Sequence, residues 1–331
     1  MDFTGYPPPI PAIEGTSWQI FGDGEIVPGT TERLQEFLKD HDVPFPSNLH
    51  LNSDGGNLAE SIKLGRFIRH SQLFTYVARP GSKPFETRPG ECLSACAMAF
   101  LGGLYRFSHK GSLYGVHRFY AQENGSIDSD SAQIISAALV EYIQSMGINP
   151  NLFKLTAQAG ADEIRLLSET EQLSLNVVNN GQGPTAWTIE SHDGWMYLRG
   201  WRDTWRGLNK FIIGCTNRGV LLDVLYNAER RGEDIIQFPV HWLIINGEYP
   251  KPTIIPIDKF LLKRQELDSN DVINSGYLLP GYIVKMIQNA DSVGIAMKPS
   301  TDSPIFMGFY GMKFAGAVDQ LRGLLNTCPK R

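Results

Sequence analysis

The first 180 residues alternate between short apolar runs and segments with helical periodicity. In LAESIKLGRFIRHS (58–71) apolar residues recur on one side of a helix, which predicts an amphipathic helix with one buried face. Short runs such as FTYVA (74–78) predict buried strands. The expected helices lie at 30–42, 58–71, 94–103 and 128–146, and the expected strands at 18–26, 47–51, 74–78 and 111–117. Strands that alternate with helices predict an α/β domain with a mostly parallel sheet.

The pattern changes at NNGQGPTA (179–186), which has the composition of a linker. Beyond it lie five of the six tryptophans and many short segments in which apolar and polar residues alternate, such as GWMYLRGW and FPVHWLIING. This alternation is typical of half-buried strands. We therefore expect two domains, an α/β domain over 1–180 and a smaller β-rich domain over 187–331 that ends in a helix.

Composition narrows the class of partner and compartment. With 42% apolar residues, 20% charged residues and a net charge of −5, the chain fits a soluble globular protein and gives no reason to expect a nucleic acid partner. No apolar run is long enough for a membrane span. The opening MDFTGYPPPIP lacks the pattern of a signal peptide, which leaves the compartment open. Four cysteines permit two disulfides, which favours an exported, periplasmic location over a cytoplasmic one.

Candidate chemistry gathers around ECLSACAMAFLGG (91–103), which sets Ser94 where a strand is expected to enter a helix. The first amides of a helix are unpaired, so the N–H of Ala95 is available to an oxyanion beside the serine hydroxyl. Upstream, Gly55 and Gly56 in NSDGGN have no side chains to block a close approach, so this turn is a candidate for a second backbone donor. Downstream, His117 in YGVHRF is the candidate base. Each feature alone has an ordinary structural interpretation as a cap, a turn or a surface histidine, but their order favours acyl-transfer chemistry.

Three ordered motifs resemble those of the ClpP/crotonase superfamily, and within it the Clp protease proteolytic subunit and its standalone periplasmic-type relatives. They are the glycine turn LNSDGGNLAESIKLGRFIR, the nucleophile segment LSACAMAFLGG and the strand-borne histidine of GSLYGVHRF, and the resemblance covers residues 16–180. It implies a ββα spiral fold with Ser94 as nucleophile, His117 as general base, and oxyanion amides from Gly56 and Ala95. It also implies a peptide or protein substrate and a homo-oligomer of unspecified size.

The third catalytic residue departs from the family pattern. In the family an acid stands four residues before a Leu/Met-Ser step, which here ends at Ser168, and the corresponding residue is Ile164. Asp162 and Glu163 stand close by, and we expect a small helical shift to bring the Asp162 carboxylate to His117. Otherwise the site is a Ser-His dyad, or another group orients the histidine. The loop 79–91 also lengthens the path to the serine, and it is expected to form either a lid or a surface excursion.

The cysteines do not have the spacing of a zinc site, because Cys92 and Cys96 are separated by three residues rather than two. They form either a short bridge that braces the serine turn or a pair of buried thiols, and export favours the bridge. Cys215 and Cys328 are candidates for a disulfide that ties the C-terminal helix to the β-rich domain. We expect no metal and no cofactor.

These observations predict a serine hydrolase, most simply a peptidase. No GxxxxGK[ST] motif occurs, so the sequence implies neither ATP use nor an unfoldase partner. One alternative is a catalytically weak or inactive ClpP-like scaffold that binds a partner through its β-rich domain, which the missing acid at position 164 favours. Another is an acyl-thioester enzyme of the crotonase branch, which the presence of both Ser94 and His117 disfavours.

Overall fold

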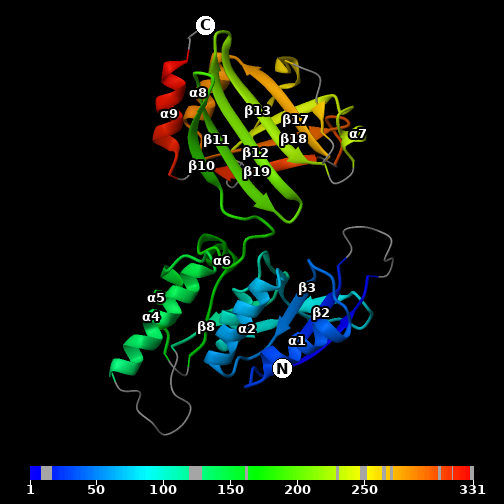
Figure 1. Ribbon diagram of the computed structural model, residues 1–331, viewed down its shortest axis with the longest axis vertical. Helices are drawn as coiled ribbons and strands as arrows, with labels where there is room; N and C mark the ends of the chain where they lie inside the picture. Colours follow the sequence, from blue (N-terminus) through cyan, green and yellow to red (C-terminus); the bar gives the residue numbers. More distant parts are fainter. Residues whose placement is uncertain are drawn as a thin grey trace. The chain divides into compact units, whose positions relative to one another are not determined.

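The computed structural model describes residues 1–8, 17–118, 129–160, 163–228, 231–246, 252–262, 266–268, 271–304, 307–314 and 316–328. The chain divides into two units, Met1–Gly181 and Gln182–Arg331 (Figure 1). Each unit has its own hydrophobic core. The first unit ends inside the segment predicted as a linker. None of the helices in these described ranges is both long enough and apolar enough to cross a membrane.

The first unit mixes strands and helices, and it contains more elements than the sequence pattern predicts. Its strands are β1 (Asp2–Tyr6), β2 (Gln19–Asp23), β3 (Asn48–Asn52), β4 (Phe74–Pro80), β5 (Thr87–Pro89), β6 (Glu91–Leu93), β7 (Arg106–Ser108), β8 (Leu113–Val116) and β9 (Arg165–Leu166). Its helices are α1 (Thr30–Asp40), α2 (Leu58–His70), α3 (Ala95–Phe100), α4 (Ser129–Ser145), α5 (Asn151–Gln158) and α6 (Glu169–Ser174). The prediction of an α/β unit is confirmed.

The larger sheet of this unit has the order β1-β2-β3-β4-β5, with β7 also paired to β4. Its central pairs β2–β3, β3–β4 and β4–β7 are parallel, whereas the edge pairs β1–β2 and β4–β5 are antiparallel. Parallel neighbours require crossover connections, which α1, α2 and α3 provide. A smaller sheet, β6-β8-β9, carries the residues of chemical interest.

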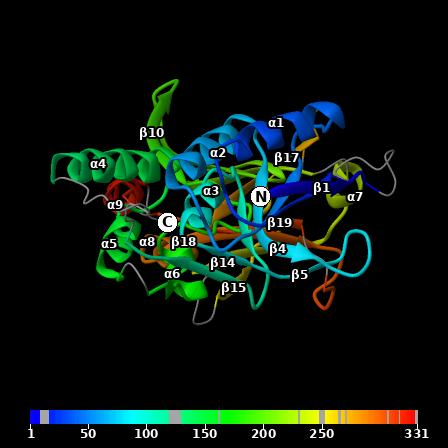
Figure 2. The same ribbon diagram turned by 90° about the horizontal axis from the view of Figure 1, so that it is seen from below.

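Helices α1 and α2 contact each other and lie side by side (Figure 2). Their apolar faces join the core through residues such as Leu34 and Leu64, which are fully buried. Helix α3 is buried on every side, and its small residues let α2 approach closely. At the closest point a Cβ on Gly102 would lie 2.1 Å from the carbonyl oxygen of Gly65, so only glycine fits there.

The second unit is β-rich and its strand pairs are antiparallel. One sheet has the order β10-β11-β12-β13-β17-β16 and the other β15-β14-β18-β19. The strands are β10 (Ala186–His192), β11 (Trp195–Thr204), β12 (Gly207–Thr216), β13 (Gly219–Asn227), β14 (Val240–Ile245), β15 (Thr253–Pro256), β16 (Glu266–Leu267), β17 (Val272–Leu279), β18 (Ser292–Lys298) and β19 (Met307–Lys313). The helices are α7 (Gly232–Ile235), η1 (Asp258–Phe260), α8 (Gly281–Gln288) and α9 (Val318–Thr327).

Alternating burial explains how this unit forms its core. Along β13 every second residue is buried, including Leu222 and Val224, as a strand with one inward face requires. These side chains share a core with residues of the other sheet such as Leu243 and Ile295. The disulfide Cys215–Cys328 ties the end of α9 to β12.

Candidate active site

Ser94 lies in the turn between β6 and α3 and has an unusual backbone conformation. Its φ of 54° and ψ of −122° fall in a region that residues other than glycine rarely adopt, at a cost of about 1–3 kcal/mol. The Ser94 N–H donates to the carbonyl oxygen of Gly115 on β8 at 2.9 Å, which holds the turn against the neighbouring strand. The side chain makes no capping bond to α3. The hydroxyl of Ser94 therefore has a different role from that of an ordinary N-cap.

The partner of that hydroxyl is His117, whose Nε2 lies 2.6 Å from Ser94 Oγ. Strand pairing explains the meeting, because β6 and β8 are parallel, with Leu93 opposite Gly115. Ser94 directly follows β6 and His117 directly follows β8, so the two side chains leave adjacent strands at the same edge. His117 is only 8% exposed. The structure thus brings together the two residues that the sequence singled out.

The other ring nitrogen of His117 determines which tautomer is present. Nδ1 lies 2.8 Å from the carbonyl oxygen of Arg118, which can only accept a hydrogen bond. The proton is therefore assigned to Nδ1, and Nε2 accepts from the Ser94 hydroxyl. A backbone carbonyl has no signature in the sequence, so this contact was not predictable.

The glycine turn after β3 packs directly against Ser94. Gly55 has a φ of 120°, and a Cβ there would lie 2.7 Å from Ser94 Cβ and 3.1 Å from the nitrogen of Ala95. Gly56 has a φ of 129° and no room for a side chain, because its Cβ would lie 2.2 Å from the carbonyl oxygen of Ile26. The Gly55 N–H donates to Ser53 Oγ at 3.1 Å. Gly56 and Ala95 remain the predicted oxyanion donors.

A disulfide spans the serine turn. Cys92 on β6 and Cys96 on α3 are joined with a Cα–Cα separation of 5.1 Å, and both are fully buried. Behind it, Tyr114 and Tyr142 donate their hydroxyls to the carbonyl oxygens of Ala97 (3.1 Å) and Met98 (2.7 Å) in α3. Burial raises the pKa of both tyrosines far above the ordinary value, so they remain neutral donors.

The far end of α3 is held by Arg69. Its guanidinium donates to the carbonyl oxygens of Gly102 (2.8 Å), Gly103 (3.0 Å) and Leu101 (3.2 Å), which follow the last turn of the helix. Partial burial lowers the pKa of Arg69 from its ordinary value, although coupling to Tyr142 opposes this shift. The helix that carries Ser94 is thus fixed at both ends.

Strand β9, which follows the residues expected to supply the acid, runs alongside the strand that precedes His117. β9 pairs antiparallel with β8, with Leu166 opposite Gly115 and Arg165 opposite Val116. Ile164, at the family's acid position, packs on β8, because a Cβ on Gly115 would lie 2.5 Å from its Cγ2. Asp162 lies outside the described residues.

Ser168, which marks the family's reference step, has a structural role. Its hydroxyl accepts from the N–H of Glu171, and the Glu171 carboxylate accepts from the Ser168 N–H, which forms a capping box at the start of α6. These hydrogen bonds hold the pKa of Glu171 below its ordinary range. Arg165 pairs with the same carboxylate at 2.8 Å.

The interval 79–91, expected as a lid or an excursion, contains a β-hairpin. β4 and β5 pair antiparallel through Arg79 and Arg88. The connecting turn is closed by Glu86, whose carboxylate accepts from the backbone N–H groups of Ser82 (2.9 Å) and Lys83 (3.1 Å). The Ser82 hydroxyl also donates to this carboxylate, at 3.0 Å, and together with the two backbone bonds it lowers the pKa of Glu86 from its ordinary value. In the described ranges no group of three or more His, Cys, Asp or Glu residues is arranged to hold a metal ion.

No protein-family model matches the chain, and no curated protein sequence matches it. Solved structures do match, and three of them each cover 49% of this chain. A variant of the 1510-N membrane-bound stomatin-specific protease has a TM-score of 0.36 and 21% identity over 75% of its own chain. ClpP1 from Listeria monocytogenes has a TM-score of 0.37 and 19% identity over 88% of its chain. A second 1510-N variant, in complex with a substrate peptide, has a TM-score of 0.35 and 20% identity over 71% of its chain. At these TM-scores the likeness carries no conclusion about activity, which has to be argued from the site.

Proposed function

We propose that the protein is a ClpP-like serine hydrolase that acts as an ATP-independent peptidase on peptide or protein substrates. The observation that carries this proposal is the 2.6 Å contact between Ser94 Oγ and His117 Nε2. A strained serine that faces a histidine of fixed tautomer meets the requirements for an activated nucleophile. The glycines of the adjacent turn have no side chains to block the approach of a substrate carbonyl to backbone donors.

The reaction proceeds in two halves. His117 Nε2 removes the hydroxyl proton as Ser94 Oγ attacks the carbonyl carbon, and the resulting oxyanion accepts hydrogen bonds from the N–H groups of Gly56 and Ala95. The imidazolium then gives the proton to the leaving amine as the acyl-enzyme forms. In the second half, His117 activates a water that releases the acid product and regenerates the serine.

The Arg118 carbonyl oxygen contributes to the orientation of His117, and we propose Asp162 as the third catalytic residue. A carboxylate adds what a carbonyl lacks, namely a negative charge that stabilises the imidazolium. Nδ1 carries one proton, so the Asp162 carboxylate would share or replace the hydrogen bond to the Arg118 carbonyl oxygen.

Labelling with a fluorophosphonate probe tests the proposal. We expect the intact protein to be labelled at Ser94, and Ser94→Ala to take no label. Ser174→Ala is the matched control, because Ser174 lies in α6, where its hydroxyl bonds to the carbonyl oxygen of Glu171. Asp162→Asn should label more slowly by about a thousandfold or more if the carboxylate acts as proposed. Folded protein that takes no label, or a Ser94→Ala variant that is labelled as well as the parent, contradicts the proposal.

The alternative of a ClpP-like scaffold with little or no activity is favoured by one observation, the apolar packing of Ile164 at the family's acid position. It predicts a folded protein that is inert to the probe and is isolated with a bound partner.

The disulfides support an exported location, because such bonds persist in oxidising compartments. The homo-oligomer stays a prediction.

A further inference from the structure

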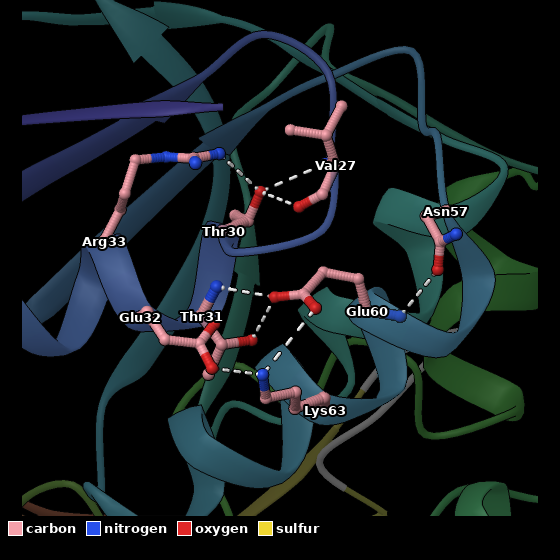
Figure 3. A network of polar contacts seen from close by, with 8 residues as sticks. All are labelled: Val27, Thr30, Thr31, Glu32, Arg33, Asn57, Glu60 and Lys63. Atoms are coloured by element: carbon pink, nitrogen blue, oxygen red, sulfur yellow. Dashed lines mark hydrogen bonds and ion pairs between the residues drawn. The ribbon is translucent and has the colours of Figure 1, made fainter.

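A buried carboxylate, Glu60, joins the first turns of α1 and α2. Its Oε1 accepts from both the N–H and the hydroxyl of Thr31, each at 2.7 Å (Figure 3). The Glu60 residue is 7% exposed. Its Oε2 lies 3.9 Å from Lys63 Nζ, which also pairs with Glu32 at the surface. A charge is costly to bury unless it is well bonded, so this arrangement fixes the start of α1 firmly onto α2.

The start of α1 is linked in turn to the glycine turn. Thr30 Oγ1 donates to the carbonyl oxygen of Val27 at 2.7 Å, which closes the segment just before the helix (Figure 3). Ile26, the residue before Val27, donates its N–H to the carbonyl oxygen of Gly55 at 2.8 Å. Its carbonyl oxygen accepts from the N–H of Asn57 at 2.8 Å. The backbone of Ile26 is therefore hydrogen-bonded to the residues on both sides of Gly56.

Gly56 has little freedom to move independently of this segment. The space where a Cβ would lie is filled by the carbonyl of Ile26, at 2.2 Å from its oxygen. On the other side of the turn, Asn57 accepts from the N–H of Glu60 through its side chain at 2.9 Å, which caps α2 (Figure 3). Any shift of the α1 start relative to α2 is thus transmitted to the Gly56 amide.

We propose that Glu60 is a positioning residue that sets the Gly56 N–H for the oxyanion, acting through Thr31 and the segment Ile26–Thr30. This inference rests on the proposed function. Glu60 itself touches neither the substrate nor Ser94. Removal of its carboxylate leaves two buried donors on Thr31 without their acceptor, so the helix start moves to reach water. A displacement of the order of an ångström at a catalytic group lowers the rate by about 100-fold.

The test compares Glu60→Ala with Glu60→Gln, because glutamine keeps an acceptor oxygen for Thr31. The readouts are kcat and KM on an ester substrate, and the inhibition constant of an alkylboronic acid, whose tetrahedral adduct with serine places an oxygen in the oxyanion position. For Glu60→Ala we expect kcat to fall about 10- to 100-fold with KM nearly unchanged, and the boronate to bind more weakly by a similar factor. Glu60→Gln should restore both values to within about threefold of the parent.

Glu32→Ala is the matched control, since it removes the exposed partner of Lys63 and leaves the acceptor of Thr31 in place. It should leave kcat and boronate affinity unchanged. If Glu60→Ala does not fold, Thr31→Val replaces it, because it deletes one donor to Glu60 at similar volume; we expect an approximately threefold to tenfold loss of kcat.

The outcomes separate the two proposals. A parent protein that neither hydrolyses the ester nor binds the boronate overturns the proposed function together with this role. An active parent whose Glu60→Ala variant keeps its kcat and boronate affinity, with only a lower melting temperature, overturns the positioning role alone. A parallel loss in Glu60→Ala and Glu60→Gln also overturns it, since the acceptor oxygen would then not be the group that matters.

Discussion

Replacing Gly56 by alanine tests how rigidly the turn beside Ser94 is built. A φ of 129° is close to inaccessible for alanine and costs about 1–3 kcal/mol. The new Cβ would also lie 2.2 Å from the carbonyl oxygen of Ile26, a backbone atom that already accepts from the Asn57 N–H. Relief requires the turn and the Ile26 segment to separate, with the loss of hydrogen bonds worth about 1 kcal/mol each. We expect Gly56→Ala to lower the free energy of unfolding of the first unit by about 3–5 kcal/mol.

Gly147→Ala provides the matched comparison. Gly147 has a φ of 73°, but nothing lies within 4 Å of its Cβ position, so alanine there costs only the left-handed conformation, about 1–2 kcal/mol. Urea titrations that are monitored by hydrogen exchange of the α2 amides report the stability of the first unit. Labelling of Ser94 by a fluorophosphonate should slow at least about tenfold in Gly56→Ala and remain unchanged in Gly147→Ala. Equal stability losses in the two variants, or full labelling of Gly56→Ala, would refute the reasoning.

The remaining predictions concern the disulfides and His50. Chain entropy assigns about 5 kcal/mol to Cys215–Cys328, with a sequence separation of 113, and about 2 kcal/mol to Cys92–Cys96, with a separation of 4. Double Cys-to-Ala variants should show this ranking in urea titrations of the unit concerned, and the reverse ranking would contradict it. Burial lowers the pKa of His50 to about 3, below the ordinary 6.5, so between these values the unfolded chain binds a proton that the folded chain excludes. Stability therefore falls as the pH drops from 6.5 towards 3, by up to about 1.4 kcal/mol per pH unit from this group. His50→Phe should flatten that part of the profile, and an unchanged slope in the variant would count against the burial argument.

The Ser94–His117 contact was predictable in part, because the ordered motifs named both residues and the apolar run ahead of His117 forms the expected strand β8. The segment 79–91 ahead of Ser94 was expected as a loop, and β6 was not among the expected strands, so the parallel β6–β8 pairing that brings the two side chains to one edge was not predicted. The close approach of the glycine turn was predictable, since consecutive glycines mark backbone that tolerates positive φ. Helix boundaries were less accurate. The helix expected over 94–103 ends at Phe100, because the carbonyls beyond it turn toward the Arg69 guanidinium.

The role of Glu60 was not predictable from the same pattern. A glutamate in the first turn of an amphipathic helix is typically solvated, and its negative charge interacts favourably with the helix dipole. Its burial comes from the packing of α1 onto α2, and its partner Thr31 is 29 residues away in the sequence. Likewise, the packing of Ile164 on β8 follows from the register between β8 and β9. A strand of two residues is too short to leave a pattern in the sequence that would predict this register.

The tautomer of His117 determines how much catalytic rate is lost because position 164 holds isoleucine instead of an acid. In serine proteases, an amide in place of the acid lowers kcat by about 10⁴, because it stabilises the wrong tautomer of the histidine. The Arg118 carbonyl oxygen, 2.8 Å from Nδ1, cannot stabilise the wrong tautomer, because it has no proton to donate. It selects the same tautomer as a carboxylate does, with Nε2 free to accept the proton of Ser94. What a carbonyl cannot provide is the negative charge beside the imidazolium, and that electrostatic contribution is the part of the mechanism that Asp162 is proposed to supply.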